Sequence, residues 1–251
     1  MAKQRGIMKL EGTIGGITFY KSRDGYLARE KGGIPAERIA NDPNFQRTRE
    51  NGSEFGRAGK AGKVLRNALR SLLQNAKDPR VVSRLTTEMV KVIQEDQTNP
   101  RGLRNVIDGE AELLIGFDFN SNAKLGNTLY APYVATIDRV TGELKVDMAS
   151  FIPSEMIAAP GGTTHFRIVS AGAEIDFENE VFTVDKNETA QLPWDPTATA
   201  VINHVNQVTA NSTKPLFLIV GVQFFQEVNG VKYSLKNGAF NALSIVKVSG
   251  V

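Results

Sequence analysis

The first 40 residues alternate short apolar stretches with glycine pairs, a pattern typical of an extended arm. Residues 16–21 are rich in β-branched and aromatic side chains, residues 22–25 contain an Asp-Gly turn, and residues 26–30 return. This pattern predicts a β-hairpin. Two strands alone are only marginally stable in water, so the arm over 1–40 must rest on its own chain or on a neighbouring subunit. The residues expected to make this contact are Ile17, Phe19, Tyr20, Tyr26 and Leu27.

Residues 41–108 space their apolar positions three and four apart, which predicts helices. The first helix is expected to begin at Pro43, with Asn41 or Asp42 as its cap, and to end near residue 77. A second helix is expected from Pro79 to about residue 97, packed against the first as a helical hairpin. The predicted buried face of the first helix comprises Phe45, Thr48, Gly52, Phe55, Gly59, Gly62, Leu65, Leu69, Leu72 and Ala76.

Four glycines, Gly52, Gly56, Gly59 and Gly62, fall inside the first predicted helix. Each costs about 1 kcal/mol relative to alanine in a helix interior. The sequence therefore predicts either a break in the helix near Gly52 or a surface where another backbone packs closely against these glycines.

From residue 109 onwards the apolar pattern becomes that of short strands. Thr-Gly at 141–142 and Asn-Gly at 229–230 are turn signals between them. The expected strands are 113–119, 133–138, 144–148, 164–177, 181–184, 216–225, 231–235 and 242–248. This spacing predicts an antiparallel β-sandwich, immunoglobulin-like or barrel-like, of about seven to nine strands. The fold class expected is α+β, with an arm over 1–40, a helical region over 41–108 and a sandwich over 109–251.

Composition narrows the chemistry that the 251 residues can perform. Cysteine is absent, which excludes disulfides, thiolate nucleophiles and cysteine zinc sites. No run of about 18 apolar residues occurs, so no membrane insertion is expected. The first 13 residues lack the apolar stretch and cleavage site of a secretory signal. A cytoplasmic location, or incorporation in a virion-like particle, is therefore expected.

Charge is distributed unevenly along the chain. Residues 1–108 carry 21 Lys and Arg against 12 Asp and Glu, a net charge of +9, whereas residues 109–251 carry 9 against 15, a net charge of −6. The difference is explained either by attraction between neighbouring copies of the chain or by ordinary solvated charges on a helical region.

A row of basic residues on the predicted helices could contact phosphates or an acidic protein surface. These residues are Arg49, Arg57, Lys60, Lys63, Arg66 and Arg70. Glu50 and Glu54 interrupt the row, and no helix-turn-helix, RNA-recognition or zinc-finger pattern accompanies it. A solvated or subunit-contacting face is therefore favoured over a nucleic-acid interface.

Candidate catalytic groups are few. His165 and His204 are the two histidines, and neither has a neighbouring serine or carboxylate in the spacing of a catalytic relay. A structural histidine with satisfied hydrogen bonds is therefore favoured for both. The acidic residues of the β region form no calcium-binding loop. Trp194 could stack on a sugar, although a tryptophan at the end of a sandwich more often packs as a plug. We expect no catalytic residues, no metal and no cofactor.

Three stretches share a distinctive pattern: Gly-Thr-Ile-Gly-Gly-Ile-Thr-Phe-Tyr-Lys at 12–21 with Gly25 and Arg29, Asp-Pro-Asn-Phe-Gln-Arg-Thr-Arg-Glu-Asn at 42–51 running into Phe55 and Gly56, and Gly-Thr-Thr-His-Phe-Arg-Ile-Val at 162–169 ending in Asp176 and Phe177. Together they resemble a widespread uncharacterised protein family of Bacteroidota and their phages. The resemblance implies the arrangement of arm, helices and sandwich, implies no enzyme activity, and suggests a phage or phage-like setting.

The sequence thus predicts a structural subunit that assembles with copies of itself, and with other particle proteins, through its arm. In this hypothesis the arm adds strands to a neighbour's sheet, and the alternating positions Ile17 and Phe19, and Tyr26 and Ala28, set the register. A nucleic-acid-binding protein that uses the basic row is the alternative.

Overall fold

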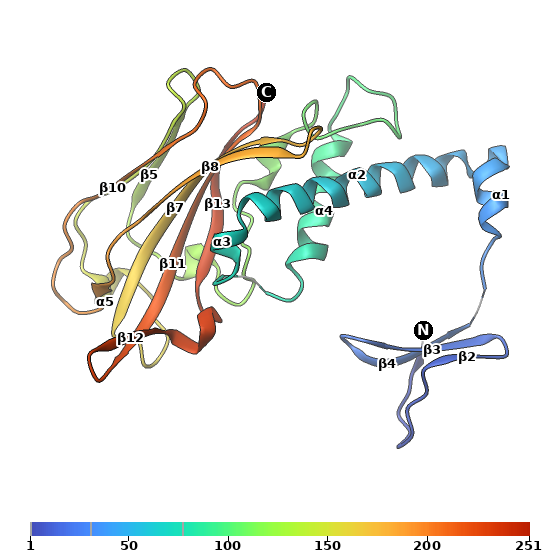
Figure 1. Cartoon of the computed structure of the whole chain (residues 1–251), viewed down its shortest axis with the longest axis horizontal. Helices are drawn as coiled ribbons and strands as arrows, with labels where there is room; N and C mark the ends of the chain where they lie inside the picture. The colour runs from blue at the N-terminus through green and yellow to red at the C-terminus, as the bar shows by residue number, and fades with distance from the viewer. Residues whose placement is uncertain (1, 31, 77) are drawn as a thin grey trace. The chain divides into compact units, whose positions relative to one another are not determined.

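The computed structural model describes residues 2–30, 32–76 and 78–251. It contains two compact units, Met1–Arg49 and Glu50–Val251 (Figure 1). The first unit is built mainly of strands, and the second combines helices with antiparallel β-sheets. The α+β class predicted from the sequence is confirmed.

The first unit contains a four-stranded antiparallel sheet with the order β1-β4-β3-β2. A short helix, α1 (Ala36–Asn41), and a 3₁₀ turn, η1 (Pro43–Phe45), follow the sheet. Asp42 precedes the 3₁₀ turn, and its side chain accepts a hydrogen bond from the backbone N–H of Asn44 at 2.9 Å. The strands are β1 (Ala2–Lys3), β2 (Gly12–Ile14), β3 (Ile17–Ser22) and β4 (Gly25–Glu30).

The predicted hairpin is confirmed as β3 and β4, which pair from Ile17 opposite Glu30 to Ser22 opposite Gly25. Gly25 has a φ of +105°, a conformation that side chains other than hydrogen rarely adopt. The two flanking strands, β1 and β2, were not predicted because they are only two and three residues long.

The second unit begins within the long helix α2 (Gln46–Ala68), which is followed by α3 (Arg70–Leu73) and α4 (Val81–Gln94). Of the two alternatives for the helix glycines, a break near Gly52 is wrong, since α2 continues through it. The expected end near residue 77 is also wrong, because the backbone at Leu69 leaves the helical region with a ψ of 16°. Figure 1 shows α4 crossing α2.

The predicted buried face of the first helix is correct only in its C-terminal part. Gly62 and Leu65 are buried, but Phe55 is 63% exposed. Glu54 is buried in its place, because its carboxylate accepts a hydrogen bond from the backbone N–H of Gly102 at 2.8 Å. A pattern of apolar positions assigns a glutamate to the surface, so the predicted buried face of the helix is displaced from the observed one.

A six-stranded antiparallel sheet forms the middle of the second unit, with β7 (His165–Asp176) and β11 (Leu216–Val228) at its centre. On the outer side of β7 lie β8 (Val181–Glu188) and β9 (Leu192–Pro193). On the outer side of β11 lie β12 (Val231–Ser234) and β13 (Ala242–Ser249). A second sheet has the order β10-β6-β5, formed by Ile202–Gln207, Glu143–Met148 and Tyr133–Asp138.

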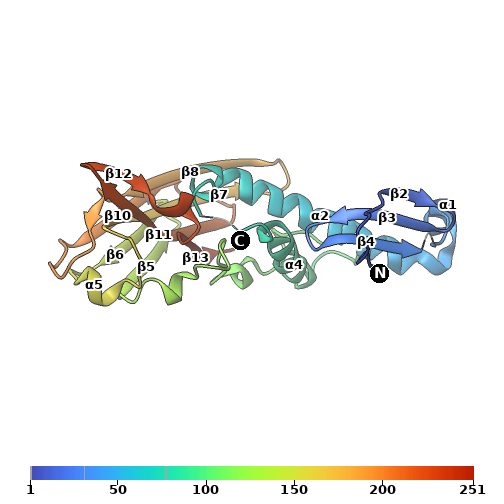
Figure 2. The ribbon, with the colours of Figure 1, turned by 90° about the horizontal axis from the view of Figure 1, so that it is seen from below.

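Helices cover one face of the six-stranded sheet and the three-stranded sheet covers the other (Figures 1 and 2). Phe217 and Ile219 of β11 belong to the core beneath the helices, with Leu65 and Leu85. Leu218 and Val220 belong to the core between the two sheets. Because β11 is buried on both faces, its sequence is a continuous apolar run. The helical region and the β region therefore share one core within the second unit.

Two strand predictions need correction. Residues expected to open the strand 113–119 instead form a 3₁₀ turn, η2 (Ala111–Leu114), and the chain pairs with β13 only afterwards, from Gly116 to Phe119. The strand β10 was missed altogether. Its inward positions include His204 and Asn206, so it lacks the alternation of apolar residues that marks a half-buried strand.

Candidate assembly interface

The arm sheet has one apolar face, made by side chains that the strand pairing places on the same side. Phe19 lies opposite Ala28 across β3 and β4, and Ile14 of β2 lies opposite Ile17. Tyr26 lies on this side as well, opposite Lys21. We call Ile14, Ile17, Phe19, Tyr26 and Ala28 the apolar face of the arm.

The other face of the arm sheet is more polar. Thr13 and Thr18 lie with their hydroxyl oxygens 3.2 Å apart. The guanidinium of Arg29 stacks over the ring of Tyr20 at 5.6 Å from its centroid. Tyr20 also lies opposite Leu27.

The five predicted arm residues are thus divided between the two faces: Ile17, Phe19 and Tyr26 belong to the apolar face, and Tyr20 and Leu27 to the other. The sequence pattern did not identify Ile14, because its own strand, β2, has only three residues.

Side chains in the first unit are poorly buried. Within residues 2–30 and 32–49, none reaches the buried class, and Ile14 and Ile17 are 63% and 45% exposed. Burying a side chain of this kind stabilises a fold by about 1.5–3 kcal/mol. The arm sheet obtains little of this stabilisation from the residues of its own unit, and a sheet with an apolar face is stabilised when another element covers that face.

The edges of the arm sheet are short. Both hairpin strands already have partners, since β1 pairs with β4 and β2 pairs with β3. Within the first unit, β1 and β2 are therefore the edge strands of the sheet. Edge strands of two and three residues offer few backbone groups to a neighbour's sheet.

The residues of the predicted basic row lie in both units and have different partners. In the first unit, Arg49 donates hydrogen bonds to the carbonyls of Ile39 and Asp42, at 2.7 and 3.0 Å. In the second unit, Lys60 forms a 3.0 Å ion pair with Glu180.

The rest of the row lies in the second unit. Arg57 lines a hollow of about 280 Å³ together with Lys60 and Glu178. Arg66 donates to the carbonyl of Gly62, while Lys63 and Arg70 are exposed. Carboxylates therefore accompany the basic groups at one end of the row, which weakens its attraction for phosphates.

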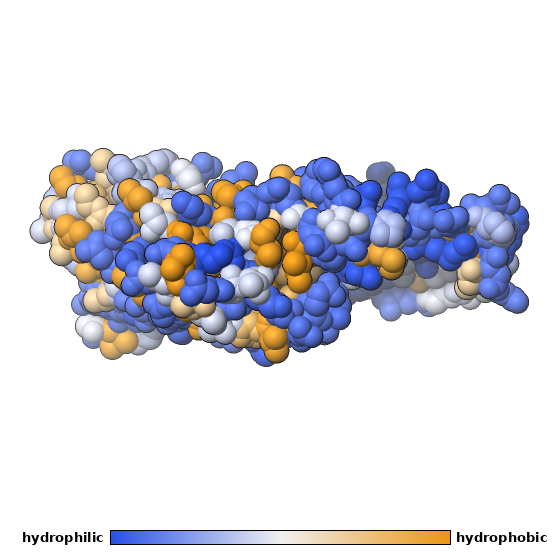
Figure 3. Space-filling model, turned by 90° about the horizontal axis from the view of Figure 1, so that it is seen from above, coloured by the Kyte–Doolittle hydropathy of each residue, from blue (hydrophilic) through white to orange (hydrophobic). Residues whose placement is uncertain are grey.

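Three of the four helix glycines face open space. A Cβ built on Gly52, Gly56 or Gly59 meets no atom within 4 Å, whereas one on Gly62 comes within 3.5 Å of the Leu85 side chain. Close packing inside this chain is therefore a role of Gly62 alone among these four glycines. On the face of the molecule drawn in Figure 3, apolar side chains are scattered over the β-sheets and the helical stretch is mainly hydrophilic.

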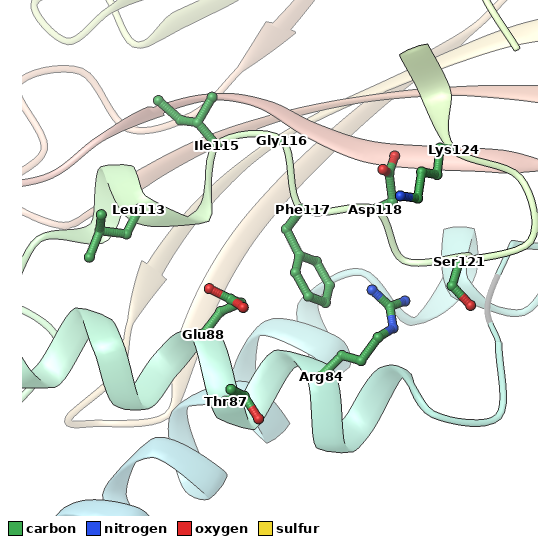
Figure 4. A pocket seen from close by; sticks show the side chains of 10 residues that line it. All are labelled: Arg84, Thr87, Glu88, Leu113, Ile115, Gly116, Phe117, Asp118, Ser121 and Lys124. Atoms are coloured by element: carbon green, nitrogen blue, oxygen red, sulfur yellow. The ribbon is translucent and has the colours of Figure 1, made fainter. Parts of the chain in front are cut away.

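A hollow of about 470 Å³ lies between α4 and the chain over residues 113–124, part of which pairs with β13 (Figure 4). Arg84 lies at its side, paired with Asp78 and with its guanidinium 5.0 Å from the ring centroid of Phe117. Asp118, also in the lining, accepts a hydrogen bond from the backbone N–H of Leu125 at 3.0 Å. Arg84, stacked on Phe117, and Asp78, which accepts a hydrogen bond from the backbone N–H of Ser121 at 2.9 Å, hold the loop against the helix, so the charged groups have a structural explanation.

A polar cluster joins the two sheets of the second unit. Ser170 Oγ lies 2.9 Å from Nδ1 of His204, and Asn206 donates to the carbonyl of Leu144 at 3.2 Å. His204 is 7% exposed, and this burial lowers its pKa. The interpretation of His204 as a hydrogen-bonded core residue agrees with these contacts.

His165 and Trp194 also have structural partners. The Nδ1 of His165 is 3.0 Å from the hydroxyl of Thr164. Trp194 donates from Nε1 to the carbonyl of Ile157 at 3.2 Å and packs against the core between the sheets. Trp194 therefore packs as a structural side chain at the core between the two sheets.

Within residues 2–30, 32–76 and 78–251, no cluster of three or more His, Asp and Glu side chains is arranged to hold a metal ion. Across the same ranges, no helix has the length and apolarity needed to cross a membrane. Comparison with known proteins finds no matching family model, no similar curated protein and no similar solved structure.

Proposed function

We propose that this chain is a non-enzymatic structural subunit that assembles with copies of itself through its N-terminal arm. The observation that carries the proposal is the arm sheet, which has an apolar face and no buried residue among 2–30 and 32–49. The second unit is different, because both of its core clusters lie wholly within residues 58–248.

A neighbouring subunit is the favoured cover for the apolar face of the arm. A sheet of about 30 residues whose apolar face is not covered by its own unit gains little burial to offset its conformational entropy. Copies of the same chain supply the covering surface in fixed proportion, as in most protein oligomers. The phage or phage-like particle in this proposal rests on the sequence resemblance, and other particle proteins are further partners in it.

Solution mass tests the proposal. Light scattering of the full chain at low salt and near 1 M salt should give a mass well above one chain. A variant lacking residues 1–33 retains every residue of both core clusters, so it should keep a cooperative unfolding transition and have the mass of one chain. A single-chain mass for the full chain in both salts, or unchanged assembly of the shortened chain, would overturn the proposal.

Titration with duplex DNA and with single-stranded RNA tests the alternative. A structural subunit should give a flat binding curve at about 0.15 M salt. A nucleic-acid-binding protein should instead bind with an affinity that falls steeply with salt, and should lose binding in a K60E/K63E/R66E variant. Salt-sensitive binding of that kind would favour the alternative over self-assembly.

A further inference from the structure

The apolar face of the arm carries opposite charges at its two ends. At one end, the ammonium groups of Lys21 and Lys9 lie 5.4 and 6.0 Å from the ring centroid of Tyr26. At the other end stands Glu30, opposite Ile17. Four residues of strand separate the two ends, about 13 Å, so Lys21 and Glu30 of one chain are too far apart to pair.

The two ends also differ in shape. A hollow of about 510 Å³ lies at the Glu30 end, lined by Ala2, Gly16, Ile17, Ala28, Arg29 and Glu30. Small side chains at three of these positions leave room for an aromatic ring. The Tyr26 ring belongs to the opposite end of the same face.

We propose that two copies of the chain pack their arm sheets face to face about a two-fold axis, with the strands of one copy antiparallel to those of the other. This inference rests on the proposed function. The arrangement brings Lys21 of each copy beside Glu30 of the other, and Tyr26 of each copy over the hollow of the other. A parallel stack would instead place Lys21 on Lys21, which like charges disfavour. A two-fold axis is also the commonest symmetry of a self-complementary contact.

This packing agrees with the edges of the arm sheet. Because β3 and β4 have partner strands on both sides, their faces are more available than their edges. The four strands have two, three, six and six residues, and at about 3.3 Å per residue and about 4.8 Å between strands they cover roughly 270 Å² on each copy. The two copies together would bury about 540 Å², which is below the roughly 1,200 Å² of a standard specific interface, so one pair of arms associates weakly.

Charge reversal tests the pairing. In K21E copies two carboxylates face each other at each end of the contact, and in E30K copies two ammonium groups do. Sedimentation velocity over a concentration series should show each variant associating about tenfold or more weakly than the unaltered chain. An equimolar mixture of the two variants, and separately the double variant K21E/E30K, should recover association to within about threefold of the unaltered chain.

Recovery in the mixture requires contact between copies, because mixing cannot change the fold of either variant. The matched control is K3E, since Lys3 lies opposite Leu27 on the other face of the sheet; it should associate like the unaltered chain.

Three outcomes would overturn the face-to-face arrangement: unchanged association of K21E and E30K, no recovery in the mixture, or a K3E defect as large as that of K21E. In each of these cases, loss of assembly on deleting residues 1–33 would still support the proposed function. A single-chain mass for the unaltered chain at every concentration would overturn both.

Discussion

The two compact units of this chain use antiparallel β-structure in different ways. In the second unit, β11 is buried on both faces, by helices on one side and by a smaller sheet on the other. In the first unit, a four-stranded sheet leaves Ile14 and Ile17 about half exposed or more. Strand pairing alone therefore does not make a closed domain. What distinguishes the second unit is that its own chain supplies a layer for each face of the central sheet.

We therefore expect the second unit to determine the stability of the fold and the first unit to determine the association between copies. Side chains of the second unit are expected to contribute to the free energy of unfolding, and side chains of the arm to the affinity between copies. Substitutions matched in chemistry but placed in different units can test this division.

The largest expected effect comes from a pair of phenylalanines. Phe217 is fully buried, with its ring centroid 6.0 Å from that of Phe177, so Phe217→Ala should lower the free energy of unfolding by about 3–5 kcal/mol. Phe19→Ala in the arm should change the main unfolding transition by less than about 0.5 kcal/mol. Urea denaturation followed by circular dichroism measures both. A comparable loss in the two variants would show that the arm belongs to the same cooperative unit.

Two glycine substitutions, at Gly172 and Gly59, should change the free energy of unfolding by smaller amounts and in opposite directions. A Cβ on Gly172 would lie 2.9 Å from Cβ of Asn206 and 3.3 Å from the Leu144 side chain, between the two sheets. Gly172→Ala should therefore cost about 1–3 kcal/mol. Gly59→Ala, in the exposed part of α2, should stabilise the protein by up to about 1 kcal/mol. Thermal unfolding of both variants gives the sign. Weaker self-association of Gly59→Ala would identify the glycine surface as a contact between copies.

The smallest effect concerns pH and the buried histidine. Burial lowers the pKa of His204 below its ordinary value of 6.5, so below pH 6.5 the unfolded chain binds more protons than the folded chain. The free energy of unfolding should fall as pH decreases from 6.5, by at most about 1.4 kcal/mol per pH unit. Urea denaturation between pH 7.5 and 5 measures this slope, and His204→Gln should reduce it. An unchanged slope in that variant would show that another group is responsible.

An aspartate provides the control for a different pH range. The backbone N–H of Asn179, together with the Lys214 ammonium 2.6 Å away, lowers the pKa of Asp176 from its ordinary value of 3.8. Its stabilisation is complete above pH 3.8 and is lost as pH falls towards the lowered pKa. Asp176→Asn should therefore leave the pH dependence of the free energy of unfolding unchanged between pH 7.5 and 5. Below pH 3.8, it should reduce the fall in the free energy of unfolding.

Much of the β-structure was predictable because its signals are local. Thr141-Gly142 and Asn229-Gly230 mark turns, and the apolar run of β11 follows from burial on both faces. The failures occur where a polar residue is buried by a distant partner. Glu54 is buried because Gly102 donates to it, and His204 is buried beside Ser170 of another sheet. A hydrophobic pattern treats both as surface residues.

The sequence by itself determined the turns, the hairpin β3–β4, most strands of the second unit and the exclusion of cysteine chemistry, since each depends on residue type or short-range spacing. Only the tertiary structure decided which face of the arm is apolar as a whole, that the hairpin strands have partner strands on both sides, and that Lys21 and Glu30 stand at opposite ends of that face. The physical reason is that the register of strand pairing decides which side chains of β2, β3 and β4 share one face. That register depends on pairings between segments, which no single segment specifies.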